Sequence, residues 1–146
     1  IKGRKYIDTP QKYYFEDLGL RNARIGFRQV EETHLMENLI YNELRIRGYL
    51  VDVGVVPTRV KDADGAYRRS QLEVDFVCNR GSERVYVQSA YRLPTEEKRK
   101  QEMASLLKID DSFRKIIITE DLIKRHMDEN GVEWVNVYDF LKSEEL

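Results

Sequence analysis

Two short segments in which apolar and polar residues alternate constrain the fold of this chain most strongly. They are residues 72–77, with the sequence LEVDFV, and residues 85–91, with the sequence VYVQSAY. Alternation at a period of two, with β-branched and aromatic residues, is typical of β-strands. Because side chains two positions apart on a strand share a face, we expect Glu73 and Asp75 to point to the same side.

The two predicted strands are close enough in the sequence to form a hairpin. Asp75 precedes Gln88 by 13 residues, and a turn with the sequence NRG lies between them. Neighbouring strands would then place two carboxylates, from Glu73 and Asp75, beside the amide oxygen of Gln88. Hard oxygen ligands of this kind suit a divalent cation such as Mg²⁺. The same pattern also fits strand carboxylates that are simply solvated or hydrogen-bonded and bind no ligand.

The rest of the chain predicts helices and further strands. Apolar residues at helical spacing predict a long helix over 29–47, which Gly48 would end. Thr95 is a fitting N-cap for another helix that runs to about residue 107. The full set of predicted helices is 16–23, 29–47, 96–107, 120–130 and 138–142, and the predicted strands are 49–60, 67–77, 84–91, 115–119 and 132–137.

This order of elements indicates the fold class. A helix, a three-stranded meander and then alternating helices and strands fit an α/β fold in which helices flank a mixed β-sheet. Residues 1–15 differ, because turn residues there separate aromatic and basic groups, which predicts a short N-terminal hairpin or wing. We therefore divide the chain into an N-terminal extension, 1–26, and an α/β domain, 27–146.

Composition narrows the function classes. The 146 residues suit one domain, and a net charge of -1 argues against a strongly basic nucleic-acid binder, although a local basic face is compatible with it. The single cysteine, Cys78, excludes an intrachain disulfide. No apolar run approaches the roughly 18 residues of a membrane helix, and we expect no signal peptide. We expect a cytoplasmic protein without membrane contact, and we read the chain as the C-terminal piece of a longer polypeptide.

Four segments, in order, carry a resemblance to a known family. They are 12–20 (KYYFEDLGL), 37–44 (ENLIYNEL), 73–77 (EVDFV) and 87–91 (VQSAY). They resemble the nuclease-like domain of unassigned role that ends prokaryotic AAA+ ATPases, after the ATPase core and a winged helix. That domain is related to the PD-(D/E)XK, or restriction-endonuclease-like, superfamily. The resemblance implies a restriction-endonuclease-like core, with residues 1–26 as the end of the winged-helix region.

The superfamily motif maps onto three positions of this chain. It consists of a glutamate on the first helix, an aspartate on the second strand and a D/E/Q-x-K sequence on the third strand. The matching residues are Glu37 or Glu43, then Asp75, then Gln88, and the resemblance favours Glu37. Active members hydrolyse phosphodiester bonds with one or two Mg²⁺ ions held by such oxygens. The resemblance therefore implies at most a weak Mg²⁺ site, made by Asp75, Gln88 and Glu37.

The lysine of the motif is missing, because Ala90 stands in its position. In active relatives this lysine orients or activates the attacking water and offsets transition-state charge. Loss of one general acid–base group costs roughly 10²–10⁴ in rate. We therefore predict a degenerate site made of Glu37, Glu73, Asp75 and Gln88, with no catalytic residue assigned. A relocated cation is the alternative, supplied by Arg92, Lys98 or Arg99.

Four arginines near the predicted meander are candidate phosphate contacts. They are Arg68, Arg69, Arg84 and Arg92. Contacts from such residues to a nucleic-acid backbone would not read sequence. No glycine-rich phosphate loop is present, so ATP would bind only in an upstream domain, and no cofactor is required by this chain.

These observations lead to one main hypothesis and two alternatives. The main hypothesis is a C-terminal accessory domain of an AAA+-type ATPase that lacks nuclease activity and binds DNA or a partner protein. The first alternative is a metal-dependent DNA endonuclease with a relocated catalytic cation. The second is an interaction module that serves only oligomerisation.

Overall fold

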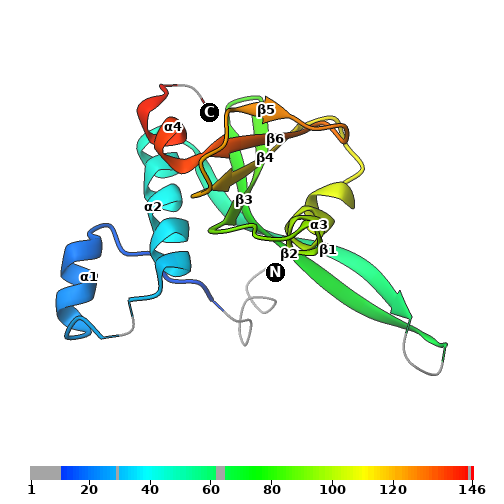
Figure 1. The fold of residues 1–146 in the computed structure, drawn as a ribbon, viewed down its shortest axis with the longest axis horizontal. Coiled ribbons are helices and arrows are strands. Elements are labelled where there is room, and N and C mark those ends of the chain that lie inside the picture. The colour runs from blue at the N-terminus through cyan, green and yellow to red at the C-terminus, as the bar shows by residue number, and fades with distance from the viewer. Residues whose placement is uncertain (1–10, 29, 62–64, 145) are drawn as a thin grey trace, which may run out of the picture.

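A six-stranded mixed β-sheet forms the centre of the computed structural model, which describes residues 11–28, 30–61, 65–144 and 146 (Figure 1). The strand order is β1-β2-β3-β4-β6-β5. The strands are β1 Leu50–Lys61, β2 Tyr67–Arg80, β3 Glu83–Ala90, β4 Arg114–Thr119, β5 His126–Met127 and β6 Val132–Asn136. The helices are α1 Leu18–Arg24, α2 Glu32–Ile46, α3 Glu96–Leu107 and α4 Val137–Lys142.

The sheet combines an antiparallel and a parallel part. Strands β1, β2 and β3 pair antiparallel as a meander, whereas β3, β4 and β6 pair parallel. A parallel step between strands requires a crossover connection, and α3 supplies it between β3 and β4. The predicted α/β class, with helices flanking a mixed sheet, is confirmed.

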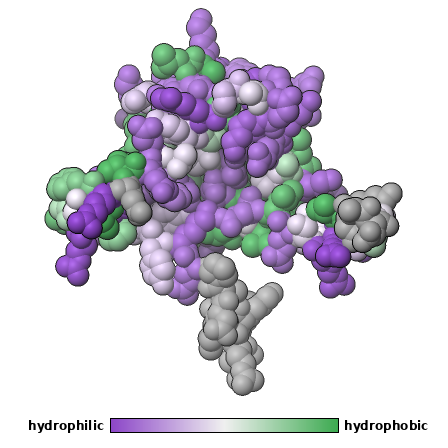
Figure 2. All heavy atoms as spheres, turned by 60° about the horizontal axis from the view of Figure 1, so that its bottom comes forward, coloured by the Kyte–Doolittle hydropathy of each residue, from purple (hydrophilic) through white to green (hydrophobic). Residues whose placement is uncertain are grey.

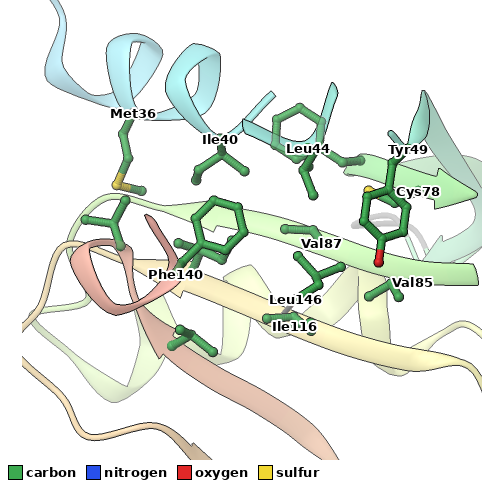
Figure 3. Close-up of a cluster of buried hydrophobic side chains, with 14 residues drawn as sticks. Met36, Ile40, Leu44, Tyr49, Cys78, Val85, Val87, Ile116, Phe140 and Leu146 are labelled. Carbon is green, nitrogen blue, oxygen red and sulfur yellow. The ribbon is translucent and has the colours of Figure 1, made fainter. Parts of the chain in front are cut away.

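Two hydrophobic clusters lie on opposite faces of the sheet. On one face, residues of α2 and α4, among them Ile40, Leu44 and Phe140, pack against the strands (Figure 3). On the other face, Met103 and Leu106 of α3 pack against a second set of strand residues. Burying apolar surface on both faces stabilises the sheet at about 25 cal/mol per Å² removed from water.

Most predicted elements are confirmed within a few residues, but the predicted helix over 120–130 is wrong. That segment contains no helix, and its His126 and Met127 form β5, which pairs antiparallel with β6. The reason is that its aspartates hydrogen-bond to backbone instead. Asp121 accepts from the Leu93 N–H, and Asp128 accepts from the Val132 N–H. Aspartate side chains that bind backbone groups in this way compete with helix formation.

The N-terminal prediction is only partly within the described part of the chain. Residues 1–10 of the predicted hairpin or wing lie outside the described residues, and residues 11–15 form no strand. The short helix α1 follows, and apolar atoms gather on the surface over it (Figure 2, left). Among the described residues, the longest helix has 15 residues, and no helix has the length and apolar character needed to cross a membrane.

A β-bulge interrupts β2 at the residues that matter most for the site. Asp52 pairs with Val77 and Gly54 pairs with Val74, so the single residue between them on β1 faces both Asp75 and Phe76. The bulge interrupts the alternation of side chains between the two faces of β2. Val74 and Val77 are three positions apart, which in a regular strand would place them on opposite faces, yet both pack in the cluster beneath α3. As a result, Asp75 and Phe76 both turn toward α2. Bulges commonly re-aim a side chain in this way.

Gly54 makes room for the bulge. A Cβ atom at this position would lie 2.8 Å from Val77 Cγ2 and 3.0 Å from Val74 Cβ. We expect Gly54→Ala to lower the free energy of unfolding by about 1–3 kcal/mol through overpacking. Urea denaturation measures this loss. In a double-mutant cycle, Val77→Ala should recover part of it, because Val77→Ala removes the clashing methyl group. Additive losses would contradict this account of Gly54.

Candidate functional site

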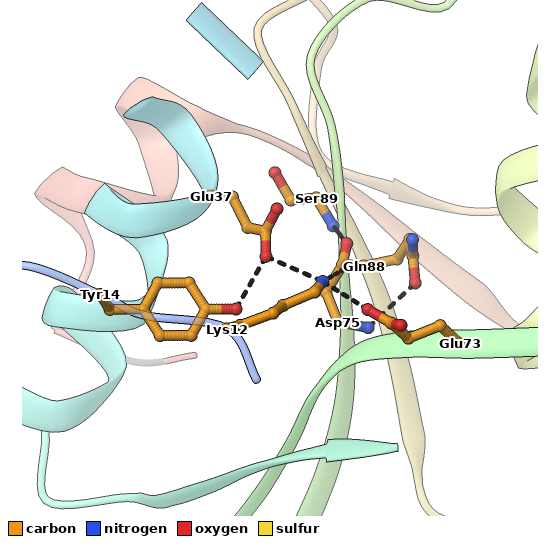
Figure 4. A network of polar contacts seen from close by, with 7 residues as sticks. All are labelled: Lys12, Tyr14, Glu37, Glu73, Asp75, Gln88 and Ser89. Carbon is orange, nitrogen blue, oxygen red and sulfur yellow. Dashed lines mark hydrogen bonds and ion pairs between the residues drawn. The ribbon is translucent and has the colours of Figure 1, made fainter. Parts of the chain in front are cut away.

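Three carboxylates converge on the amine of Lys12 (Figure 4). Lys12 Nζ lies 3.0 Å from Glu37 Oε1, 2.5 Å from Glu73 Oε1 and 3.1 Å from Asp75 Oδ1. Glu37 comes from α2, whereas Glu73 and Asp75 come from β2. Asp75 is buried, and half of the Glu73 side chain is exposed. The arrangement is an ion-pair cluster at the edge of the core, with three negative charges and one positive charge.

Hydrogen bonds to α2 fix the segment that carries Lys12. The side chain of Asn38, on the buried face of α2, accepts from the Phe15 N–H and donates to the Phe15 carbonyl, both at 2.8 Å. Asn42 donates to the same carbonyl. These bonds satisfy a buried amide that would otherwise cost roughly 1–3 kcal/mol. Phe15 is thereby held against the helix, and Lys12 lies three residues before it in the same segment.

Tyr14 anchors the same segment through its ring and its hydroxyl. Its ring stacks on Tyr41 at a centroid distance of 4.1 Å and lies near Phe76. Its hydroxyl donates to Glu37 Oε1 at 2.7 Å. Burial and this hydrogen bond raise the pKa of Tyr14 well above its ordinary value, so Tyr14 stays a neutral donor at neutral pH.

The site lies where β2 and β3 stop pairing. Their ladder ends at Phe76 and Val87. Beyond it, the Asp75 N–H donates to Gln88 Oε1 at 3.3 Å, and the Ser89 N–H donates to Asp75 Oδ2 at 2.9 Å. The two side chains thus satisfy backbone donors where the ladder opens. Gln88 lies beside Asp75, as the sequence suggested, but its oxygen faces the backbone of β2.

Burial and neighbouring charges act on Asp75 in opposite directions. Burial raises the pKa of Asp75 above its usual range, the Ser89 N–H and Lys12 lower it, and Glu37 raises it again, with a net upward shift. For Lys12, burial lowers the pKa, but contacts with Glu73, Asp75 and Glu37 outweigh that effect and raise it above its ordinary value. Lys12 therefore carries its charge throughout the neutral range.

The convergence point does not fit a divalent cation while Lys12 occupies it. Mg²⁺ requires oxygen ligands at about 2.0–2.1 Å in near-octahedral geometry. The three carboxylate oxygens instead surround the Lys12 amine at hydrogen-bonding distances. In the part of the chain that the structure describes, no group of three or more His, Cys, Asp or Glu residues is arranged to hold a metal ion.

The cations that the sequence suggested for relocation have partners outside the carboxylate cluster. A cleft of about 470 Å³ beside Glu37 and Ser89 is lined by Arg92 and Lys98, but Arg92 pairs with Glu120 and Lys98 pairs with Glu102. Arg99 lies over the Trp134 ring. Ala90, at the position of the motif lysine, packs with residues of α3 and also lines this cleft.

Other predicted residues separate from the site. Glu43 pairs with Arg47 on its own helix. Arg84, at the start of β3, donates to Asn79, and Arg92 lies just beyond the end of β3. The four candidate arginines therefore do not form one rim, because Arg68 and Arg69 lie far along β2 from β3.

Lys12 is the site residue that sequence reasoning missed. It lies in the segment 12–20 that carries the resemblance, but nothing local shows that this segment returns to α2 and β2. The polar Asn38 on an otherwise apolar helix face was a usable signal, because a buried amide requires a hydrogen-bonding partner.

The fold and the site define an α/β domain with a carboxylate–lysine cluster at the point where its meander opens. No family model matches the chain, and no solved structure matches it at a significant level. An uncharacterized protein of Haemophilus influenzae is 33% identical over 141 residues, which cover 97% of this chain. The chain spans 31% of the length of that relative.

We expect Lys12→Met to destabilise the chain more at about pH 7 than at about pH 4. The pKa of Asp75 is already raised in the folded chain, and loss of Lys12 raises it further. A carboxyl with a raised folded pKa contributes stability that is present below its unfolded pKa and is lost as pH rises through its folded pKa. The raised pKa of Lys12 keeps its own contribution intact at both pH values.

The expected loss at about pH 7 is roughly 1–3 kcal/mol, below the cost of breaking a fully buried ion pair. Urea denaturation at the two pH values measures it, and ¹³C NMR titration follows the Asp75 carboxyl. Lys98→Met is the matched control, since it removes a lysine paired on α3, and should cost less than about 1 kcal/mol. An equal loss at both pH values would contradict the assigned role of Lys12.

Proposed function

We propose that this chain is a DNA-binding accessory module with a degenerate restriction-endonuclease-like site, which holds DNA without cutting it. One observation carries the proposal. The amine of Lys12 lies among Glu37, Glu73 and Asp75, at the centre of the cluster where the resemblance would place a metal ion. The alternative is that the module binds a protein and not DNA, and the binding experiment below distinguishes the two.

The arrangement of elements supports the restriction-endonuclease-like core. The resemblance expects a glutamate from the first helix of the core, an aspartate from the second strand and a Gln-x-Ala remnant on the third. Glu37 lies on α2, Asp75 on the second strand of the meander and Gln88 on its third strand. These side chains lie together although they are far apart in sequence.

Two properties of Lys12 argue against catalysis. An ammonium group has three N–H donors, and Lys12 Nζ already contacts three carboxylates. It therefore has no donor left to orient an attacking water or a phosphate oxygen. Its raised pKa also makes it a poor general base near neutral pH, since efficient proton transfer needs a pKa near the working pH.

The AAA+ parent is supported by the resemblance of the four segments and by the length of the Haemophilus relative, most of which lies outside the match. Under this proposal, the longer polypeptide contains a Walker A loop that binds ATP, and the present chain forms its C-terminal module. DNA held by the module would then be either the substrate on which the ATPase acts or a ligand that regulates the ATPase. A longer polypeptide without such a loop would contradict this part of the proposal.

A metal-dependent endonuclease is the second candidate, and one observation favours it. A lysine does lie next to Asp75 and Glu37, although it comes from residue 12 and not from the third strand. With Lys12 present, the cluster keeps two more negative charges than positive ones. A divalent cation that displaced the Lys12 amine would balance them.

We expect the full chain to bind duplex DNA but not to cleave it with Mg²⁺ or Mn²⁺. Nicking of supercoiled plasmid measures cleavage, and fluorescence anisotropy of a labelled duplex measures binding. Affinity should fall as salt rises, because arginine–phosphate contacts release counterions. Cleavage that both Asp75→Ala and Lys12→Met abolish would establish the endonuclease. The absence of DNA binding would instead favour a protein partner.

Removal of the Lys12 amine should create a divalent-cation site. We expect wild-type chain to bind Mn²⁺ in the millimolar range or not at all, and Lys12→Met to bind it at least about tenfold more tightly, a change of about 1.4 kcal/mol. Isothermal titration calorimetry measures both affinities, with Lys98→Met as the matched control. Micromolar Mn²⁺ binding by the wild type, abolished by Asp75→Ala, would overturn the role given to Lys12.

A further inference from the structure

The outer half of the β1–β2 hairpin projects from the body as a two-stranded ribbon (Figure 1). Beyond the end of the β2–β3 ladder, β2 keeps only β1 as a partner, from Val55 opposite Glu73 to Lys61 opposite Tyr67. We call residues 57–61 and 67–71 the free ribbon. Its five residue pairs extend over about 13 Å at roughly 3.3 Å per residue.

The two faces of the ribbon carry different residues. Cross-strand partners share a face, and residues two apart alternate onto that face again. One face therefore carries Arg59 opposite Arg69, and Pro57 opposite Gln71, all of them exposed. The same face leads to Glu73 and thus to the Lys12 cluster. The other face carries Thr58 opposite Ser70, both half-buried, and Val60 opposite Arg68, both exposed.

Arg59 and Arg69 form an unfavourable pair in the isolated chain. They are direct cross-strand neighbours, and like charges in that position are destabilising. Among the described residues, neither has an ion-pair partner. Hydrophilic and hydrophobic residues lie side by side toward the end of the ribbon in the space-filling view (Figure 2, right). Two adjacent cations that form no ion pair within the described part of the chain favour an anionic partner.

The shape of the ribbon fits duplex DNA. The major groove of B-form DNA is about 12 Å wide and 8.5 Å deep, and it admits a two-stranded β-ribbon. Strands about 4.8 Å apart, with their side chains, match that width, and a projection of about 13 Å exceeds that depth. Double-stranded RNA fits poorly, because its major groove is deep and narrow.

We propose that the free ribbon lies in the major groove of duplex DNA, with Arg59 and Arg69 against the phosphates that border the groove. This inference rests on the proposed DNA-binding function and names the element and the form of nucleic acid. Arg69 was a candidate from the sequence, whereas Arg59 becomes one only through the strand register. The Lys12 cluster, with its excess negative charge, would keep phosphates on the ribbon and away from Asp75.

The test compares the full chain with Arg59→Gln/Arg69→Gln in anisotropy titrations over a range of salt concentrations. The slope of log affinity against log salt should fall by about 1.8, at roughly 0.9 per lost phosphate contact. The matched control is Lys108→Gln/Lys124→Gln, which removes two exposed cations outside the ribbon and should leave the slope unchanged. The ribbon variant should also unfold at no lower urea concentration than wild type, since a like-charge pair is removed.

A duplex RNA of the same sequence should bind at least tenfold more weakly than the DNA. Equal RNA and DNA affinity would overturn the groove assignment, and an equal loss in both double variants would overturn the role of the ribbon. If wild type binds DNA and the ribbon variant binds with the same affinity and slope, the ribbon inference fails while the proposed function stands. If wild type binds no duplex, both fail.

Discussion

Strands β2 and β3 stop pairing at Phe76 and Val87. The carboxylate site lies at that point, and the free ribbon lies further along β2. Backbone groups at such an opening require partners, and the side chains of Asp75 and Gln88 provide them. The bulge next to the opening turns Asp75 toward α2, and Gly54 is the residue that leaves space for it. The position of the site is therefore a consequence of how the sheet divides.

Charge balance then decides what the site can do. Three carboxylates in a partly buried position repel each other, and burial of Asp75 adds to the cost of its charge. Lys12 offsets one of the three charges, and the hydrogen bonds of Tyr14 and Asn38 hold the segment that carries it against α2. A residue of the chain thus takes the position that a bound cation would require. The proposed function, binding without cleavage, rests on this arrangement.

Local sequence patterns predicted what depends on near neighbours. Thr95 caps α3 as expected, by accepting from the Lys98 N–H. The same reasoning failed for residues 120–130, where helix-compatible residues form a loop and β5. There, Asp121 accepts a hydrogen bond from the distant Leu93 N–H and Asp128 accepts one from the nearby Val132 N–H, and these bonds compete with the helix.

The sequence by itself determined the α/β class, the meander and the closeness of Asp75 to Gln88, because alternation and turn signals act over a few residues. Only the tertiary structure decided that Lys12 meets Glu37, 25 residues away, and Asp75, 63 residues away. It also decided that Arg59 faces Arg69, since strand register depends on packing and on the bulge. Contacts between distant segments depend on the whole fold, and no short pattern records them.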